Sequence, residues 1–171
     1  MSTDSFLYFA YGSNMFTPWL RQPARCPSAR ALGIAELRGR ELRWHKASKD
    51  KSGKCDIPVV PSASVLGVLY AIANNEKTPL DRAEGKGFGY EEVEVEVLSG
   101  PNPVRAITYQ ATDIDPIRRP YTWYRAFVIA GAREHELPAS YIAELEAVPA
   151  DVDPDRERHD RNMALIGEVR A

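Results

Sequence analysis

The chain of 171 residues contains little cysteine or histidine, with two of the former and three of the latter. The cysteines, Cys26 and Cys55, stand far apart, which favours two buried thiols over a structural disulfide. None of the histidines has metal-ligand spacing to another histidine or to a cysteine. The sequence therefore predicts no metal site.

Charge of one sign and long apolar runs are lacking as well. The formal net charge is -2, which provides no basic field for nucleic acid. No apolar run approaches the roughly 18 residues that a membrane-spanning helix needs. The first four residues carry none of the positive charge of a signal peptide. We therefore expect a cytoplasmic protein without nucleic-acid or membrane partners, whose oligomeric state these features do not specify.

The length suits one domain with its own core, over residues 1–171. Hydrophobic patterns predict strands at 6–10, 31–37, 41–45, 65–73, 90–98 and 104–111. Apolar residues at helical spacing predict helices over 123–133, from Pro138 onward and from Asp153-Pro154 onward. Strands followed by helices favour an α+β domain over regular βαβ winding.

Two of the predicted strands have distinctive patterns. Residues 92–97 alternate strictly between glutamate and valine, so one face is expected to be solvated and the other buried. Residues 65–70 are continuously apolar, which is typical of a strand buried on both faces. Gly67 within that run indicates a bulge or the close approach of another backbone segment.

A polar, cationic segment over residues 46–54 separates two strand-like stretches. One interpretation is a solvated hairpin loop. The other is a flap over a cleft for an acidic ligand.

The first predicted strand runs into a tight turn, Tyr11-Gly12-Ser13-Asn14, and Thr17-Pro18 then resembles a capped helix start. A strand that ends in such a turn leaves backbone N–H groups unpaired, and these can hold an anion.

A second feature is a carboxylate at the end of a short helix. Thr78-Pro79 predicts the helix start, with Thr78 as the cap, and Gly85 predicts the end. Leu80 and Glu84 are four residues apart and share a face, so a buried Leu80 brings Glu84 inward. Burial would raise the pKa of Glu84 and suit it to proton transfer.

The alternative interpretation is that Glu84 is exposed, or pairs with Arg82 or Lys86. Glycines at 85, 87 and 89 weigh against it, because they allow a backbone to approach a ligand closely. No Gly-Lys-Ser/Thr follows them, so they do not form a phosphate loop.

Together these segments resemble the γ-glutamylcyclotransferase family of the AIG2-like superfamily. The matching residues are 9–15, 66–70, 80–85, Tyr90, Tyr124, 131–138, Tyr141 and Leu145. The resemblance implies a small mixed β-barrel flanked by helices, with a cavity at one end. It also implies a cofactor-independent reaction on a small γ-glutamyl substrate, in which the α-amine attacks the γ-carbonyl to give 5-oxoproline and a free amine.

By this resemblance Glu84 is the general acid and base. The substrate-binding residues that it implies are Tyr11, Gly12, Ser13, Asn14, Tyr90 and Tyr124. Backbone N–H groups of the turn would hold an oxyanion or the substrate's α-carboxylate. For each tyrosine, packing in the core is the alternative role.

Other residues have two interpretations each. Trp123 and the segment 116–120 can shape the pocket mouth. Arg118 and Arg119 either recognise a second carboxylate or are surface charges. His45 is interpreted as structural rather than catalytic.

Two other functions remain open. A non-catalytic binding or interaction module can use the same fold. Hydrolysis of a γ-glutamyl amide would give glutamate instead of 5-oxoproline. Ser13 does not stand in a Gly-x-Ser-x-Gly nucleophile elbow, so a serine mechanism is not predicted.

Overall fold

The computed structural model describes residues 4–170, without the side chains of 169 and 170. Three of the four residues on which the expectation of no signal peptide rests, residues 1–3, lie outside the described part. The strands are β1 (Ser5–Ala10), β2 (Arg30–Arg40), β3 (Arg43–Ala47), β4 (Gly53–Asp56), β5 (Val59–Ala73), β6 (Tyr90–Ser99) and β7 (Asn102–Ala111). The α-helices are α1 (Thr17–Leu20), α2 (Lys77–Glu84), α3 (Thr122–Glu134), α4 (Ala139–Glu146) and α5 (Arg156–Arg170). Short 3-10 helices are η1 (Ser13–Met15) and η2 (Asn74–Glu76).

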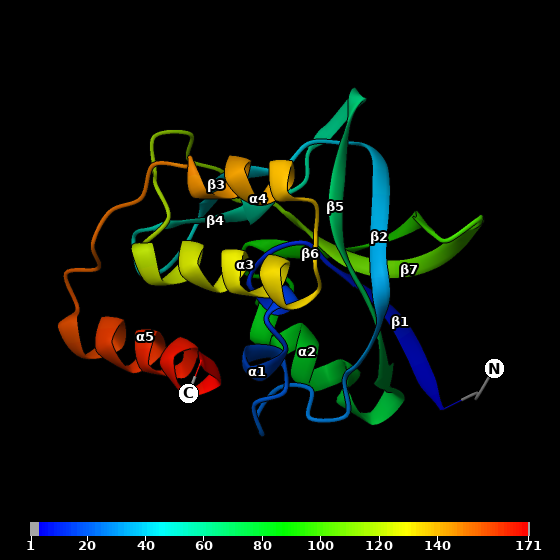
Figure 1. Cartoon of the computed structure of the whole chain (residues 1–171), viewed down its shortest axis with the longest axis horizontal. Helices are drawn as coiled ribbons and strands as arrows, with labels where there is room; N and C mark the ends of the chain where they lie inside the picture. Colours follow the sequence, from blue (N-terminus) through cyan, green and yellow to red (C-terminus); the bar gives the residue numbers. More distant parts are fainter. Residues whose placement is uncertain (1–3, 171) are drawn as a thin grey trace.

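A closed barrel forms one half of the molecule, with the strand order β1-β5-β2-β6-β7. A parallel pairing of β1 with β7, at Tyr8 and Ile107, closes it, whereas the other pairs are antiparallel. Strands β3 and β4 form a separate two-stranded sheet. Helices α3, α4 and α5 gather on one side of the barrel (Figure 1). The predicted α+β class and mixed barrel are confirmed.

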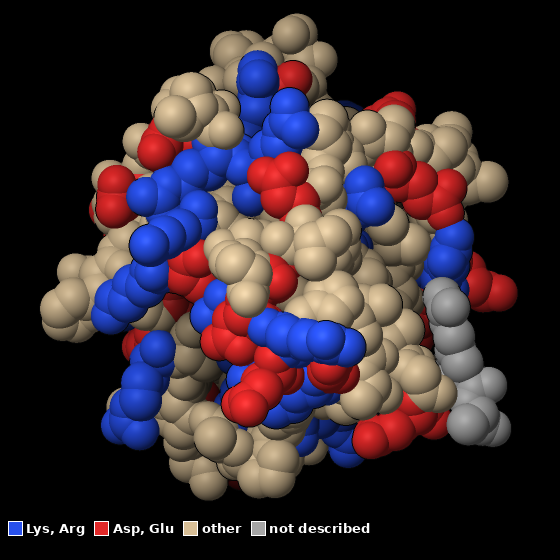
Figure 2. Space-filling model, turned by 90° about the vertical axis from the view of Figure 1, so that its left-hand side faces the viewer, with Lys and Arg blue, Asp and Glu red and all other residues tan. Residues whose placement is uncertain are grey.

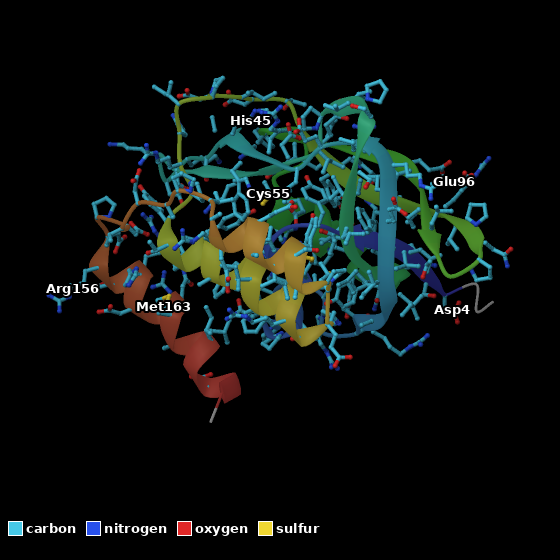
Figure 3. All side chains as sticks on the ribbon, turned by 45° about the horizontal axis from the view of Figure 1, so that its top comes forward. Asp4, His45, Cys55, Glu96, Arg156 and Met163 are labelled. Carbon is cyan, nitrogen blue, oxygen red and sulfur yellow. The ribbon has the colours of Figure 1, made fainter. Side chains whose placement is uncertain are left out.

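The patterns of β5 and β6 are explained by their places in the barrel. Val95 and Val97 are buried in β6, while Glu96 lies on the outer surface (Figure 3). Gly67 in β5 faces Phe9 and Ala10 of β1, where a Cβ would overlap the Ala10 carbonyl and the Phe9 ring. The close backbone approach expected at Gly67 is therefore confirmed.

Sequence reasoning missed one strand and misplaced two helix caps. Strand β4 was not predicted, because Gly53-Lys54-Cys55-Asp56 has no apolar pattern. Tertiary hydrogen bonds hold this strand, for example the one that the backbone N–H of Ala111 donates to the Asp56 carboxylate at 2.8 Å. Thr78 is not the cap of α2, because the chain enters through η2 and the N-cap is Glu76.

Thr17 is likewise not a cap, since Phe16 occupies that position. The Thr17 hydroxyl instead lies 2.9 Å from the Tyr70 hydroxyl. A tertiary contact has therefore replaced the local capping bond that the sequence predicted.

Helix α3 packs directly on the turn that follows β1. A Cβ on Gly131 would lie 2.5 Å from the Met15 carbonyl carbon and from the Phe16 nitrogen, so only glycine allows this contact. The Phe16 ring stacks on Phe127 of α3, with centroids 5.6 Å apart. The Tyr70 hydroxyl donates to the Met15 carbonyl at 2.9 Å. The turn is thus held between β5 and α3.

The surface mixes charges of both signs. Figure 2 shows basic and acidic side chains interspersed over the face at the left of Figure 1. In the described part of the chain, no helix is long and apolar enough to cross a bilayer. Both cysteines are buried free thiols.

Candidate active site

The side chain of Glu84 points inward from the last residue of α2. Gly85 ends the helix in the left-handed conformation, with φ of 71°. Leu80 is fully buried, and only 18% of the Glu84 side chain is exposed. Lys86 pairs with Asp81 and Glu92, at 3.6 and 3.4 Å, and not with Glu84. The inward orientation that the sequence predicted is confirmed.

Asn14 connects the turn to this carboxylate. Its side-chain amide donates to Glu84 and, at 3.0 Å, to the Tyr8 hydroxyl. Arg25 donates to the amide oxygen of Asn14 at 2.6 Å and lies 4.0 Å from the Glu84 carboxylate. Asn14 is 3% exposed, so these bonds form out of contact with bulk water. Asn14 therefore holds the carboxylate and the guanidinium in fixed relative positions.

Sequence reasoning missed Tyr8 and Arg25. Tyr8 lies within the predicted first strand, whose continuous apolar and aromatic run predicts burial but assigns no role to any one side chain. Arg25 lies in an irregular segment between α1 and β2, where no periodicity assigns a direction to a side chain. Only the folded chain brings both beside Glu84.

The pKa of Glu84 is raised because burial disfavours its charged form. The Arg25 guanidinium opposes this most strongly, followed by the Asn14 amide, Lys46 and the Tyr8 hydroxyl. The raised pKa brings the carboxyl closer to neutrality, where it can both accept and return a proton.

Glu84 lies in an inner pocket of about 280 Å³. The pocket is lined by Tyr8, Tyr11, Gly12, Ser13, Asn14, Cys55, Glu84, Tyr90, Tyr109 and Tyr124. All seven site residues named from the sequence are among them. The structure adds Tyr8, Cys55 and Tyr109, and Figure 3 shows Cys55 in the interior of the molecule.

The hydroxyls of the three predicted tyrosines are used differently. Tyr11 donates to the Tyr109 carbonyl, and Tyr90 donates to the Cys55 carbonyl at 2.6 Å. Tyr124 instead accepts the backbone N–H of Cys55 at 3.1 Å. Tyr11 and Tyr90 thus have their protons committed to backbone, whereas the Tyr124 hydroxyl bonds both the backbone N–H and the thiol of Cys55.

The turn presents backbone donors to the pocket. Within residues 4–170, the N–H groups of Gly12, Ser13 and Asn14 donate to no other residue. A Cβ on Gly12 would lie 3.2 Å from both the Cys55 Cβ and the Tyr124 hydroxyl, so glycine permits the tight packing here. These donors are available to an anionic ligand.

The other nucleophile types at the pocket are not activated. Burial raises the pKa of the Cys55 thiol to about 12, so it stays protonated near neutral pH. The Ser13 side chain has no hydrogen bond to a histidine or an acid within the part of the chain that the structure describes. Glu84 is therefore the group at this site that can move a proton.

An outer pocket of about 630 Å³ adjoins the inner one and shares four lining residues with it: Ser13, Glu84, Tyr90 and Tyr124. The others that line it are Trp19, Arg25, Lys46, Ser48, Lys54, Ala83 and Trp123. Glu84 consequently lies between the two pockets. Trp123 lines the outer pocket as expected, but the segment 116–120, expected to shape the same mouth, lines neither pocket.

Arg118, Arg119 and His45 line neither pocket. Arg118 pairs with Asp115 at 3.1 Å, and Arg119 is largely exposed. His45 bonds the buried Asp56 at 2.8 Å. His45 therefore has the structural contact that the sequence predicted, while half-buried Arg118 also donates to the Ser48 carbonyl at 2.7 Å and is not a plain surface charge.

The glycine-rich segment serves a purpose that the sequence did not indicate. Gly89 has φ of +119°, and a Cβ there would lie 2.8 Å from Cε of Lys46. The space that this glycine leaves is taken by the Lys46 side chain rather than left open to a ligand.

Comparison with known proteins shows which protein family this chain resembles. The model of the AIG2-like family matches residues 64–145. A solved structure described as a γ-glutamyl cyclotransferase superimposes with a TM-score of 0.86 at 27% identity, covering 96% of this chain and 99% of that one. The bovine γ-glutamylcyclotransferase is 31% identical over 152 residues, which span 85% of this chain and 79% of the relative.

The human γ-glutamylcyclotransferase matches to the same extent, at 31% identity over 152 residues. The fold is thus shared with a named relative over most of the chain. The chain belongs to the γ-glutamylcyclotransferase family.

Proposed function

We propose that this protein is a γ-glutamylcyclotransferase that releases 5-oxoproline and a free amine from a small γ-glutamyl substrate. The observation that carries the proposal is the position of Glu84, between a tyrosine-lined inner pocket and a larger outer one. The inner pocket would hold the glutamyl group, and the amide to be broken would lie beside the carboxylate. The other six predicted residues would bind the glutamyl group.

The chemistry needs one group that both takes and gives a proton. Glu84 would remove a proton from the α-ammonium, and the amine would then attack the γ-carbonyl carbon. As the tetrahedral intermediate collapses, the C–N bond to the leaving group breaks and Glu84 returns the proton to the departing nitrogen. The attacking nitrogen gives its second proton to the released amine, which leaves a neutral lactam and an ammonium. One amide replaces another, so the reaction is redox-neutral and proceeds without a cofactor.

The turn would stabilise negative charge during this step. Free N–H groups of Gly12, Ser13 and Asn14 suit an oxyanion or the substrate's α-carboxylate. The Tyr124 hydroxyl, which lines both pockets, would exchange its bond to the Cys55 thiol for one to the bound substrate. Because ring closure requires a folded glutamyl chain, positioning by the inner pocket would supply much of the acceleration.

Replacing Arg25 should change the pH dependence of the reaction. The Arg25 guanidinium lowers the pKa of Glu84, so Arg25→Gln is expected to raise that pKa further. Glu84 acts first as a base and must be ionised, so the acidic limb of the kcat/KM profile should move to higher pH. Exposed Arg82 provides the matched control, and Arg82→Gln should leave the profile in place. An unmoved acidic limb in Arg25→Gln would contradict this electrostatic role.

Removing the Tyr124 hydroxyl should slow turnover. Tyr124→Phe is expected to lower kcat/KM by about tenfold, the worth of roughly one hydrogen bond. Tyr141→Phe is the control, since Tyr141 bonds the backbone of Leu66 outside both pockets. Equal activity of the two variants would show that Tyr124 serves packing alone.

The direct test is incubation with a panel of γ-glutamyl amino acids and γ-glutamyl amines, with products followed by mass spectrometry. We expect 5-oxoproline that is absent with Glu84→Gln. Glutamate as the product would indicate the hydrolase instead. Thermal stabilisation by a substrate without any product would indicate a binding module.

The whole chain, residues 1–171, would act as one domain, because barrel and helices contribute to one hydrophobic core. We place the reaction in the cytoplasm, an assignment supported by two free thiols that form no disulfide.

A further inference from the structure

The outer pocket is lined by three cations, Arg25, Lys46 and Lys54, and by one carboxylate, Glu84. Both lysines come from the β3–β4 sheet, so the cationic segment 46–54 contributes to the pocket wall. The segment forms the tip of the β3–β4 hairpin, as the first interpretation has it, and its lysines line a cleft, as the second has it. A ligand that enters here meets an excess of positive charge.

Lys46 is the least satisfied of the three cations. It is 8% exposed, and within residues 4–170 its ammonium forms no ion pair or hydrogen bond. Asp113 and Glu84 favour its charged form only at longer range, while burial lowers its pKa. Its nitrogen lies 4.9 Å from the centroid of the Tyr90 ring. The Lys46 side chain lines the outer pocket, so an anionic ligand there would pair with an ammonium that has no protein partner among the described residues.

Arg25 and Lys54 are held in place by aromatic rings. The Arg25 guanidinium lies 4.6 Å from the centroid of the Trp19 ring, and its buried Nε atom has no hydrogen-bond partner. Lys54 pairs with Asp50 at 3.1 Å, and its nitrogen lies 4.3 Å from the ring centroids of Trp123 and of Tyr124. The cations are therefore fixed around the pocket rather than free to turn into solvent.

We propose that the outer pocket receives the leaving amine and selects amines that carry two carboxylates, as in γ-glutamyl-glutamate. The proposal rests on the proposed function, in which the scissile amide lies beside Glu84. One carboxylate would pair with Lys46, and the second would be held by Arg25 and Lys54. A polyamine leaving group would instead place a cation against Lys46.

The test compares γ-glutamyl-glutamate with γ-glutamyl-glutamine, two substrates of the same shape that differ by one negative charge. We expect a kcat/KM about tenfold higher for the diacid, as for one charge-assisted hydrogen bond, expressed mainly in KM. The ratio should fall as salt rises, because salt screens the charges. A γ-glutamyl diamine should have the lowest kcat/KM of the three substrates.

Lys46→Gln should bring the ratio of the two kcat/KM values close to one, and Lys46→Arg should restore part of it. Exposed Lys49 lies in the same segment outside the pocket, so Lys49→Gln should keep the wild-type ratio. If Lys46→Gln fails to fold, as judged by thermal melting, the salt dependence of the kcat/KM ratio in the wild-type protein is the test. A ratio that does not fall as salt rises would then overturn the selectivity.

The outcomes separate the two proposals. Equal kcat/KM for diacid and amide, with 5-oxoproline formed from both, would overturn the selectivity and leave the cyclotransferase in place. Loss of the preference in Lys49→Gln to the same extent as in Lys46→Gln would also overturn it. Absence of 5-oxoproline from every substrate would overturn the proposed function and this inference together.

Discussion

Glu84→Gln is expected to lower kcat by about 10²-fold or more, the scale of losing a general acid–base. The amide matches the shape of the carboxyl and can still accept from Asn14, but it cannot carry a proton from the α-ammonium to the leaving nitrogen. The measurement is the rate of 5-oxoproline formation at saturating substrate. Full turnover by this variant would rule out the mechanism.

The fold of Glu84→Gln should persist. The folded-state pKa of Glu84 is raised, so the native protein holds this proton more tightly than the unfolded chain. That contribution to stability is present below the unfolded pKa and is lost as pH rises through the raised one. Glutamine does not titrate, so we expect no fall in Tm at pH 8. Glu91→Gln, on the exposed face of β6, controls for the change of charge.

Gly131→Ala is expected to cost about 3 kcal/mol of stability, or roughly 6–12 °C in Tm. The added methyl would meet backbone atoms of Met15 and Phe16 at 2.5 Å, and backbone cannot move aside as a side-chain tip can. The neighbouring residue Asn14 holds Glu84, so displacement of the turn should also lower kcat. Thermal melts and 5-oxoproline kinetics on the same preparation measure both effects.

Gly167→Ala is the matched control, because Gly167 also lies in a helix but has no atom within 4 Å of an added Cβ. In a helix interior, alanine is favoured over glycine by up to about 1 kcal/mol, so this variant should be slightly more stable than the wild type. If both variants gain stability alike, the contact between α3 and the turn does not require glycine.

Local features of the site were readable from the sequence because they depend on residues close together in the chain. A strand that ends at Tyr11-Gly12 and a helix that ends at Gly85 are both local properties. The four-residue spacing of Leu80 and Glu84 gave the inward direction of the carboxylate in the same way. Even so, local capping rules misplaced Thr17 and Thr78, where tertiary contacts and η2 override them.

The surroundings of Glu84 come from segments far apart in sequence. The bond between Asn14 and Glu84 spans 70 residues, and Lys46 reaches the outer pocket only because β3 pairs with the unpredicted strand β4. No sequence periodicity connects these segments, since their proximity follows from barrel closure and strand register.

By itself, then, the sequence determined the class of fold, the turn and the carboxylate, each through short-range geometry and a hydrophobic pattern. Only the tertiary structure decided that Arg25 and Asn14 hold Glu84, and that Lys46 lines the outer pocket beside it without an ion pair to another described residue. The physical reason is that the pKa of a carboxyl and the charge of a pocket depend on distances through space, which folding alone sets.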